Sequence, residues 1–167
     1  GALLVAHDLK DAKPGRTLAA LYLDPLLARV RKGGGKVYAD ATPIILLIDV
    51  KSAAGPTYAA LHGVLSRYTE LLTVFRADGR RGGPVTAIIS GNRDEAAMQA
   101  QAVRYAALDG RKAHLDSAVS ADLVPLISEN WRQLSPWNWI GPMPEAARTS
   151  LADWVARAHA RGRKLRF

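Results

Sequence analysis

Two short, continuously apolar runs constrain the fold of this chain more than any other feature. They are IILLIDV at residues 44–50 and VTAIIS at residues 85–90, and both are rich in isoleucine and valine. Runs without polar alternation are typical of strands that are buried on both faces, as in a parallel sheet covered by helices. We therefore expect an α/β fold in which these two runs are strands of a parallel sheet.

Helical patterns lie between and after these two runs. Over residues 57–77 and 144–160, apolar side chains recur at spacings of three and four, which is the period of an amphipathic helix. An order of strand, helix, strand, helix is typical of βαβ units. Further helices are expected near residues 18–32, 94–103 and 120–128, and further strands at residues 3–8, 105–109, 131–137 and 164–167. The expected core positions of the two main helices are Leu61, Leu65, Tyr68, Leu72, Phe75, Ala147, Leu151, Trp154, Val155 and Ala158.

Reactive side chains follow nearly every expected strand at its carboxyl end. In a closed (β/α)8 barrel these ends meet at one mouth, which is where barrel enzymes have their active sites. An open nucleotide-binding sheet is disfavoured, because the chain contains no glycine-rich phosphate-binding motif. The sequence therefore predicts a TIM-type barrel. The residues at the strand ends are His7, Asp8, Asp49, Lys51, Ser90, Asn92, Arg93, Asp109, Arg111, Ser135, Trp137 and Asn138.

The predicted barrel is incomplete. We count about six strand–helix units, where a closed barrel needs eight and usually takes about 250 residues. The chain has 167 residues, its first expected strand begins almost at residue 1, and its last expected strand begins at residue 164. We therefore expect residues 1–167 to be a single barrel domain that lacks the first strand region and the closing units.

The composition excludes some classes of protein and leaves two classes of partner open. No apolar run approaches the ~18 residues of a membrane-spanning helix, and the absence of cysteine excludes disulfides and thiolate metal sites. The formal net charge of +8 attracts anions such as phosphorylated substrates, nucleic acid or an anionic lipid surface. The basic residues are dispersed and no aromatic side chains interleave with them, so no specific nucleic acid is expected.

The runs LLVAHD at residues 3–8 and LLIDVKS at residues 46–52 resemble a known group of enzymes. They are similar to motifs of the superfamily of glycerophosphodiester phosphodiesterases and phosphatidylinositol-specific phospholipases C, in the branch that includes altered inheritance of mitochondria protein 6. The resemblance implies a phosphodiesterase in which His7 is the general acid or base. It also implies that Asp49 ligates a divalent cation, Mg²⁺ or Ca²⁺, and that Lys51 faces the phosphate.

Other motifs of that superfamily do not occur in this chain. Its members carry a second histidine and a Glu-x-Asp pair upstream of the His-Asp strand, whereas six residues precede His7 and the chain contains no Glu-x-Asp. Asp49 also stands where the superfamily usually has glutamate. We therefore expect the isolated segment to bind little metal and to turn over little substrate.

Five further residues are candidates for binding the substrate or its phosphate. Each has a structural alternative. Arg93 could bind phosphate or help a turn in which Asn92 or Asp94 caps the next helix. Asp109 and Arg111 could belong to the site or pair with each other. Trp137 and Asn138, in a loop bounded by proline, could line a head-group pocket, whereas burial in the core is the alternative for one of the tryptophans. His62, His114 and His159 are expected to be solvated.

Two functions follow from these observations. The first is a metal-dependent phosphoric diester hydrolase that acts on glycerophosphodiesters or phospholipid head groups. The alternative is a non-catalytic basic α/β module that binds an anionic polymer or makes peripheral contact with a membrane surface. The oligomeric state is left open, although an incomplete barrel would expose unpaired strand edges. The compartment is also left open, with export from a bacterial cell as one option.

Overall fold

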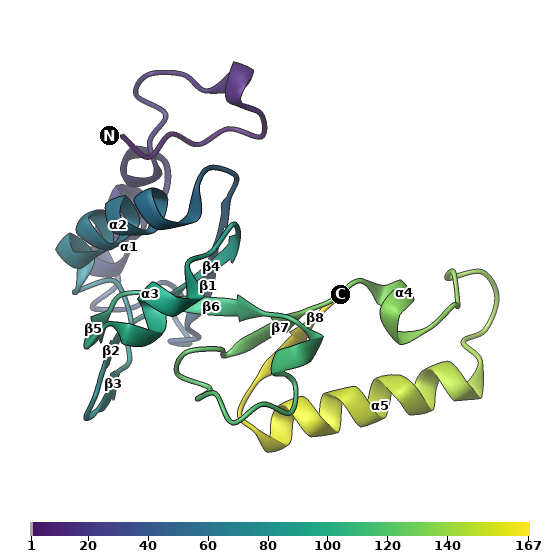
Figure 1. The fold of residues 1–167 in the computed structure, drawn as a ribbon. Coiled ribbons are helices and arrows are strands. Elements are labelled where there is room, and N and C mark those ends of the chain that lie inside the picture. Colours follow the sequence, from purple (N-terminus) through teal and green to yellow (C-terminus); the bar gives the residue numbers. More distant parts are fainter. Residues whose placement is uncertain (1) are drawn as a thin grey trace. The chain divides into compact units, whose positions relative to one another are not determined.

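The computed structural model describes residues 2–167 and has a mixed α/β architecture (Figure 1). The chain divides into two compact units, the first ending at Ala107 and the second comprising Leu108–Phe167. In both units, parallel strands are joined by segments that contain helices. The α/β class predicted from the apolar runs is thereby confirmed.

The first unit is built around two parallel strands. Strand β1 (Ile44–Val50) pairs with β4 (Val85–Gly91) over its whole length, in a register that joins Ile44 to Val85 and Val50 to Gly91. Helix α2 (Ala54–Leu65) follows β1, and helix α3 (Glu95–Ala100) follows β4. Strand β4 is buried as predicted. The prediction that β1 is buried on both faces is wrong: Ile45 is 41% exposed, and β1 pairs with another strand along one side only within residues 2–167.

A small antiparallel sheet lies in the connection between α2 and β4 and just after α3. It has the strand order β3-β2-β5, made of β2 (Val74–Arg76), β3 (Gly79–Arg81) and β5 (Val103–Arg104). The helix predicted over residues 57–77 is therefore too long, since α2 ends at Leu65 and a single 3-10 turn, η3 (Ser66–Tyr68), follows it. The hairpin register pairs Arg76 with Gly79, so Ala77 and Asp78 form the two-residue turn and Gly79, with φ +129°, is the first residue of β3.

The predicted core of this segment is nevertheless confirmed. The five apolar residues expected on one helix face are all buried, although three of them lie after α2 has ended. Burial was therefore predicted more accurately than the conformation that produces it. These residues are Leu61, Leu65, Tyr68, Leu72 and Phe75.

The segment before α1 differs most from its prediction. Residues 3–8 form no strand, and only Leu4 makes an isolated antiparallel bridge, to Thr17. Backbone hydrogen bonds between this segment and residues 16–18 close a loop instead of extending a parallel sheet. The helix expected near residues 18–32 is present as η2 (Ala19–Leu23) continued by α1 (Asp24–Lys32), and a short 3-10 turn, η1 (Leu9–Asp11), precedes both.

The second unit contains three short parallel strands in the order β6-β7-β8. They are β6 (Ala107–Gly110), which begins at the last residue of the first unit, β7 (Leu126–Ser128) and β8 (Lys164–Arg166). Helix α5 (Glu145–Ala160) leads into β8 and confirms the helix predicted over residues 144–160. Trp154 and Ala158 of α5 pack with Leu115, and Leu134 and Leu165 lie against that cluster.

Two predictions for the second unit are wrong. Residues 131–137 form helix α4 (Trp131–Leu134) and a loop, because the Asn130 side chain caps the helix by accepting a hydrogen bond from the Arg132 N–H at 2.9 Å. Residues 120–128 form a turn and β7 in place of a helix. The 3-10 turn η4 (Lys112–His114) is the helical segment between β6 and β7.

Across residues 2–167, every helix falls short of the length and apolarity that crossing a membrane requires.

Candidate functional site

The end of β1 carries an ion pair. Asp49 and Lys51 are two residues apart and therefore project from the same side of the extended chain. The structure brings them together, with Nζ of Lys51 2.7 Å from Oδ2 of Asp49. The side chain of Lys51 is 64% exposed and that of Asp49 is 51% exposed. The preceding apolar run predicts that this pair is shielded, and that prediction is wrong.

The turn after β4 is hydrogen-bonded to the end of β1. Gly91 adopts φ +71°, and a Cβ at this position would overlap the backbone of Val50. The backbone N–H of Asn92 donates to the Val50 carbonyl at 2.8 Å. The Asn92 side-chain amide donates to the carbonyls of Lys51 and Ser52 at 3.3 and 3.1 Å. Asn92 thus fixes the backbone that presents Lys51.

Arg93 lies beside this turn. Its guanidinium donates to the Gly91 carbonyl at 3.3 Å, and the residue is half-buried. Of the two residues proposed from sequence to cap the next helix, it is Asp94 that does so, since its carboxylate accepts from the Ala97 N–H at 3.0 Å. Helix α2 differs, because Ala53 at its cap position supplies no side-chain hydrogen bond.

The start of α2 and the turn after β4 line an open pocket of about 440 Å³ at the carboxyl ends of β1 and β4. A helix start without a side-chain cap leaves backbone N–H groups unsatisfied, and the helix dipole makes that end attractive to anions. Of the two charged residues in its lining, Arg93 favours a small anion and Glu95 opposes one. Its lining residues are Ala54, Gly91, Asn92, Arg93 and Glu95.

His7 lies in the segment that was expected to be a strand. Its side chain is 91% exposed, and Nδ1 is 3.3 Å from Oδ2 of Asp8. A loop position places fewer restraints on a side chain than a strand end does, so the pairing with Asp8 is the local contact that orients His7. The catalytic role assigned to His7 stays a prediction.

The remaining candidates belong to the second unit. Asp109 is fully buried, and its Oδ2 accepts a hydrogen bond from Nη1 of Arg111 at 2.9 Å, so the pairing alternative for these two residues is realised. Trp137 is half-buried, and its indole N–H donates to the Ile140 carbonyl at 3.2 Å. The Asn138 side-chain oxygen accepts from the Ile140 N–H at 3.3 Å.

The residues present do not form a complete site for Mg²⁺ or Ca²⁺. Such ions take six or more oxygen ligands, usually with several carboxylates. No cluster of three histidine, aspartate or glutamate side chains occurs in the described part of the chain, and the carboxylate of Asp49 is occupied by Lys51. We therefore assign no step to a cation here.

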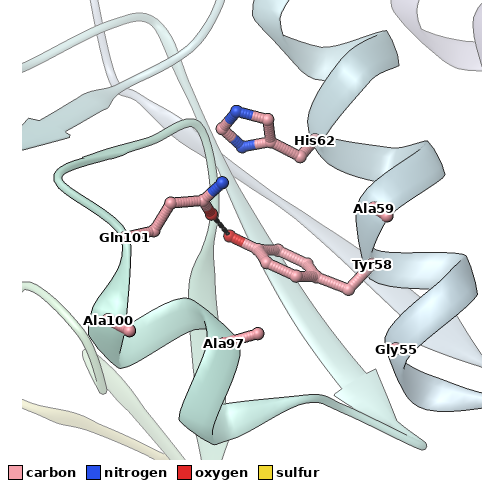
Figure 2. Close-up of a pocket in the computed structure, with 7 residues that line it drawn as sticks. All are labelled: Gly55, Tyr58, Ala59, His62, Ala97, Ala100 and Gln101. Atoms are coloured by element: carbon pink, nitrogen blue, oxygen red, sulfur yellow. Dashed lines mark hydrogen bonds between the residues drawn. The ribbon is translucent and has the colours of Figure 1, made fainter.

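A second pocket, of about 460 Å³, lies between α2 and α3 and was not predicted (Figure 2). The Tyr58 hydroxyl donates to Oε1 of Gln101 at its centre, and burial raises the pKa of Tyr58 to about 12. His62 is half-buried with its ring 5.1 Å from that of Tyr105, so its predicted solvation is wrong. The spacing of four between Tyr58 and His62, which puts both on one face of α2, was the available signal.

No known family model matches this chain, and no curated protein or solved structure gives a significant match.

Proposed function

We propose that this chain is part of a phosphoric diester hydrolase of the α/β barrel type that acts on glycerophosphodiesters or phospholipid head groups. The observation that carries the proposal is the open pocket at the carboxyl ends of β1 and β4. Arg93 and the uncapped start of α2 border it, and Lys51 lies one residue beyond β1. The carboxyl edge of parallel strands is where α/β enzymes bind their ligands.

The pocket supplies what a phosphoryl group needs. Arginine binds phosphate oxygens in a fixed fork, lysine acts as a point charge, and backbone N–H groups at a helix start add further donors. Lys51 and Arg93 are the cations of this proposal, and they neutralise the charge that develops on the phosphoryl oxygens. Asn92 positions Lys51, because its amide holds the carbonyls of Lys51 and Ser52.

Cleavage of a phosphodiester also needs proton transfer. One proton leaves the attacking hydroxyl and one proton reaches the departing oxygen. A histidine is suited to both because its ordinary pKa is close to neutral pH. In this proposal His7 carries one of these transfers, a role that comes from the resemblance of LLVAHD to the superfamily motif.

The barrel is part of the proposal as well. Strand β1 has one unpaired edge within residues 2–167, and its apolar side chains are half-exposed. Further βα units would cover these side chains and pair this edge. A closed barrel would also bring the carboxyl ends of all its strands to one mouth.

Hydrolysis of bis(4-nitrophenyl) phosphate by the longest natural form of the protein tests this function, with Mg²⁺, with Ca²⁺ and with chelator. We expect His7→Ala to lower the rate at least 100-fold, in line with the loss of a general acid or base. We expect a similar loss for Lys51→Met, in line with the loss of a charge that stabilises the phosphoryl oxygens. The matched controls are His159→Ala and Lys32→Met, which replace exposed residues at the ends of α5 and α1. Equal rates in all variants would contradict the proposal. Salt-dependent binding of polyanions without any hydrolysis would favour the basic binding module instead.

A further inference from the structure

One face of the β6-β7-β8 sheet carries polar and charged side chains. Paired residues of neighbouring strands point to the same face, and so do residues two apart along a strand. The register pairs Asp109 with Leu126, Leu126 with Lys164, and Ser128 with Arg166. These five residues therefore share one face of the sheet.

The opposite face is apolar and covered. Ile127 is fully buried there, and Leu165 packs against the cluster of Leu115, Trp154 and Ala158 that includes helix α5. In Figure 1 the carboxyl-terminal end of α5 lies near β8, the strand into which it leads. The two faces therefore differ: one is apolar, whereas the other carries Asp109, Ser128, Lys164 and Arg166 beside the buried Leu126.

Ser128 is the unusual residue on the polar face. It is 6% exposed, and within residues 2–167 its Oγ atom has no hydrogen-bond partner. A buried hydroxyl without a hydrogen-bond partner costs free energy. Its occurrence at the end of a strand is explained if a ligand supplies the missing hydrogen-bond partner. The Thr73 hydroxyl, which is buried to a similar extent, is paired with Thr86 at 2.9 Å and shows the usual arrangement.

The charged residues near Ser128 indicate which kind of ligand group would pair with its hydroxyl. Arg166 of β8 is paired with Ser128 in the sheet register, and Lys164 lies two residues before Arg166 on β8. Both basic side chains are exposed. The buried carboxylate on this face, Asp109, is paired with Arg111. Glu129, the next residue after Ser128, accepts from the N–H groups of Asn130 at 2.9 Å and Lys112 at 3.3 Å.

We propose that Ser128, Arg166 and Lys164 form an oxyanion site whose ligand is a phosphate group. The Ser128 hydroxyl donates one hydrogen bond to a phosphate oxygen, the Arg166 guanidinium donates two in parallel, and Lys164 adds a positive charge. The identification of the anion as phosphate rests on the proposed function, whereas the site itself rests on the register and on the unpartnered Ser128 hydroxyl. Inorganic phosphate and the phosphomonoester of glycerol present the same chemistry to these residues.

A thermal-shift titration tests this site. Inorganic phosphate and, separately, glycerol 3-phosphate are added to residues 1–167 at constant ionic strength, with sodium chloride as the balancing salt. We expect both ligands to raise the melting temperature, and Ser128→Ala and Arg166→Gln each to weaken the apparent affinity roughly tenfold or more, as expected for a lost hydrogen bond to a charged group. The controls Ser150→Ala and Arg148→Gln, both on α5, should retain the affinity of the unchanged chain.

The ligand-free samples supply a second readout. If Ser128 serves a ligand, Ser128→Ala removes an unsatisfied hydroxyl and leaves the melting temperature unchanged or higher. A lower melting temperature without ligand would mean a structural role and would overturn the inference. It would also be overturned if phosphate failed to stabilise the chain, or stabilised all variants equally.

Lys51→Met separates this inference from the proposed function. If Lys51→Met abolishes the stabilisation by phosphate while Ser128→Ala and Arg166→Gln retain it, phosphate binds at the β1–β4 pocket, and the inference fails while the proposed function stands. If Ser128→Ala and Arg166→Gln lose the stabilisation but the longest natural form hydrolyses no phosphodiester, the site stands and the proposed function fails.

Discussion

Oδ2 of Asp49 lies 2.7 Å from Nζ of Lys51, and the two exposed side chains form an ion pair at the end of β1. An exposed pair of this kind contributes little to stability, because water screens both charges. In the proposed phosphate site we expect its effect on ligand binding to be larger, since Asp49 would offset the charge that Lys51 offers to an anion.

Asp49→Asn should leave the melting temperature almost unchanged and should raise the affinity for inorganic phosphate about fivefold in the absence of metal, as expected for removing one negative charge at close range in water. Calorimetric or fluorescence titration with phosphate measures the change. Asp11→Asn, which alters net charge equally at an exposed residue of η1, should have no such effect. Unchanged or weaker phosphate binding in Asp49→Asn would contradict this role.

Gly91→Ala should lower the free energy of unfolding by about 2 kcal/mol or more, because φ +71° is strained for alanine and the added methyl overlaps neighbouring backbone. Gly63→Ala is the matched control. Gly63 lies inside α2, has open space where a Cβ would be, and should gain about 0.5–1 kcal/mol. Urea unfolding of both variants checks the opposite signs, and equal effects would contradict the argument.

Arg163→Met should lower the free energy of unfolding by about 3 kcal/mol. Arg163 is 2% exposed, and its guanidinium donates to the carbonyls of His114, Leu115, Ser117 and Val119. Methionine fills similar space but donates no hydrogen bond. The His114 carbonyl would keep the Ser117 N–H and the Ser117 carbonyl would keep Arg161 as donors, so the loss falls mainly on Leu115 and Val119. Arg161→Met, two residues earlier and exposed, should change stability little. Urea unfolding measures both variants. If Arg163→Met lowers the free energy of unfolding no more than Arg161→Met does, the Arg163 guanidinium does not stabilise the segment of residues 114–119.

Tyr58→Phe should change how stability depends on alkaline pH. Burial raises the pKa of Tyr58 to about 12 in the folded chain, against about 10 when unfolded. The contribution of neutral Tyr58 is therefore fully present below pH 10 and is lost as the pH rises from 10 toward 12. Tyr58→Phe lacks this loss, so its stability relative to the unchanged chain should rise over that range. Urea midpoints at pH 8 and pH 11 measure it, with Tyr22→Phe, an exposed tyrosine, as the control. A relative stability of Tyr58→Phe that is the same at both pH values would contradict the assignment.

The parts of the fold that were predictable are those in which local pattern and tertiary packing agree. Strands β1 and β4 follow from continuous runs of isoleucine, leucine and valine, and α5 follows from its apolar period and from Pro144 at its start. The pairing of Asp49 with Lys51 follows from the two-residue period of a strand.

The predictions that were wrong concern segments whose conformation depends on contacts with other segments, which a local sequence pattern does not reveal. LLVAHD has the composition of a strand, but a strand needs a neighbour, and residues 16–18 offer only a short bridge. Two errors could have been avoided from the sequence. Asp78-Gly79 is a dipeptide typical of turns and argues against a helix that runs to residue 77, and Asn130 predicts a helix start at residue 131. The hydrogen bonds from the Asn92 side chain to the carbonyls of Lys51 and Ser52 join two segments that are distant in sequence, so no local sequence pattern could predict them.

Backbone amide chemical shifts of residues 1–167, followed by NMR during titration with glycerol 3-phosphate, test whether a phosphate group binds at the carboxyl ends of β1 and β4. We expect changes at residues 51–55 and 91–95, in and beside the β1–β4 pocket, and we expect Lys51→Met to remove them. Changes around Ser128 and Arg166 would report the second proposed site and should persist in Lys51→Met. Changes that avoid these residues, or the absence of any change at millimolar ligand, would contradict a phosphate site at the carboxyl ends of β1 and β4.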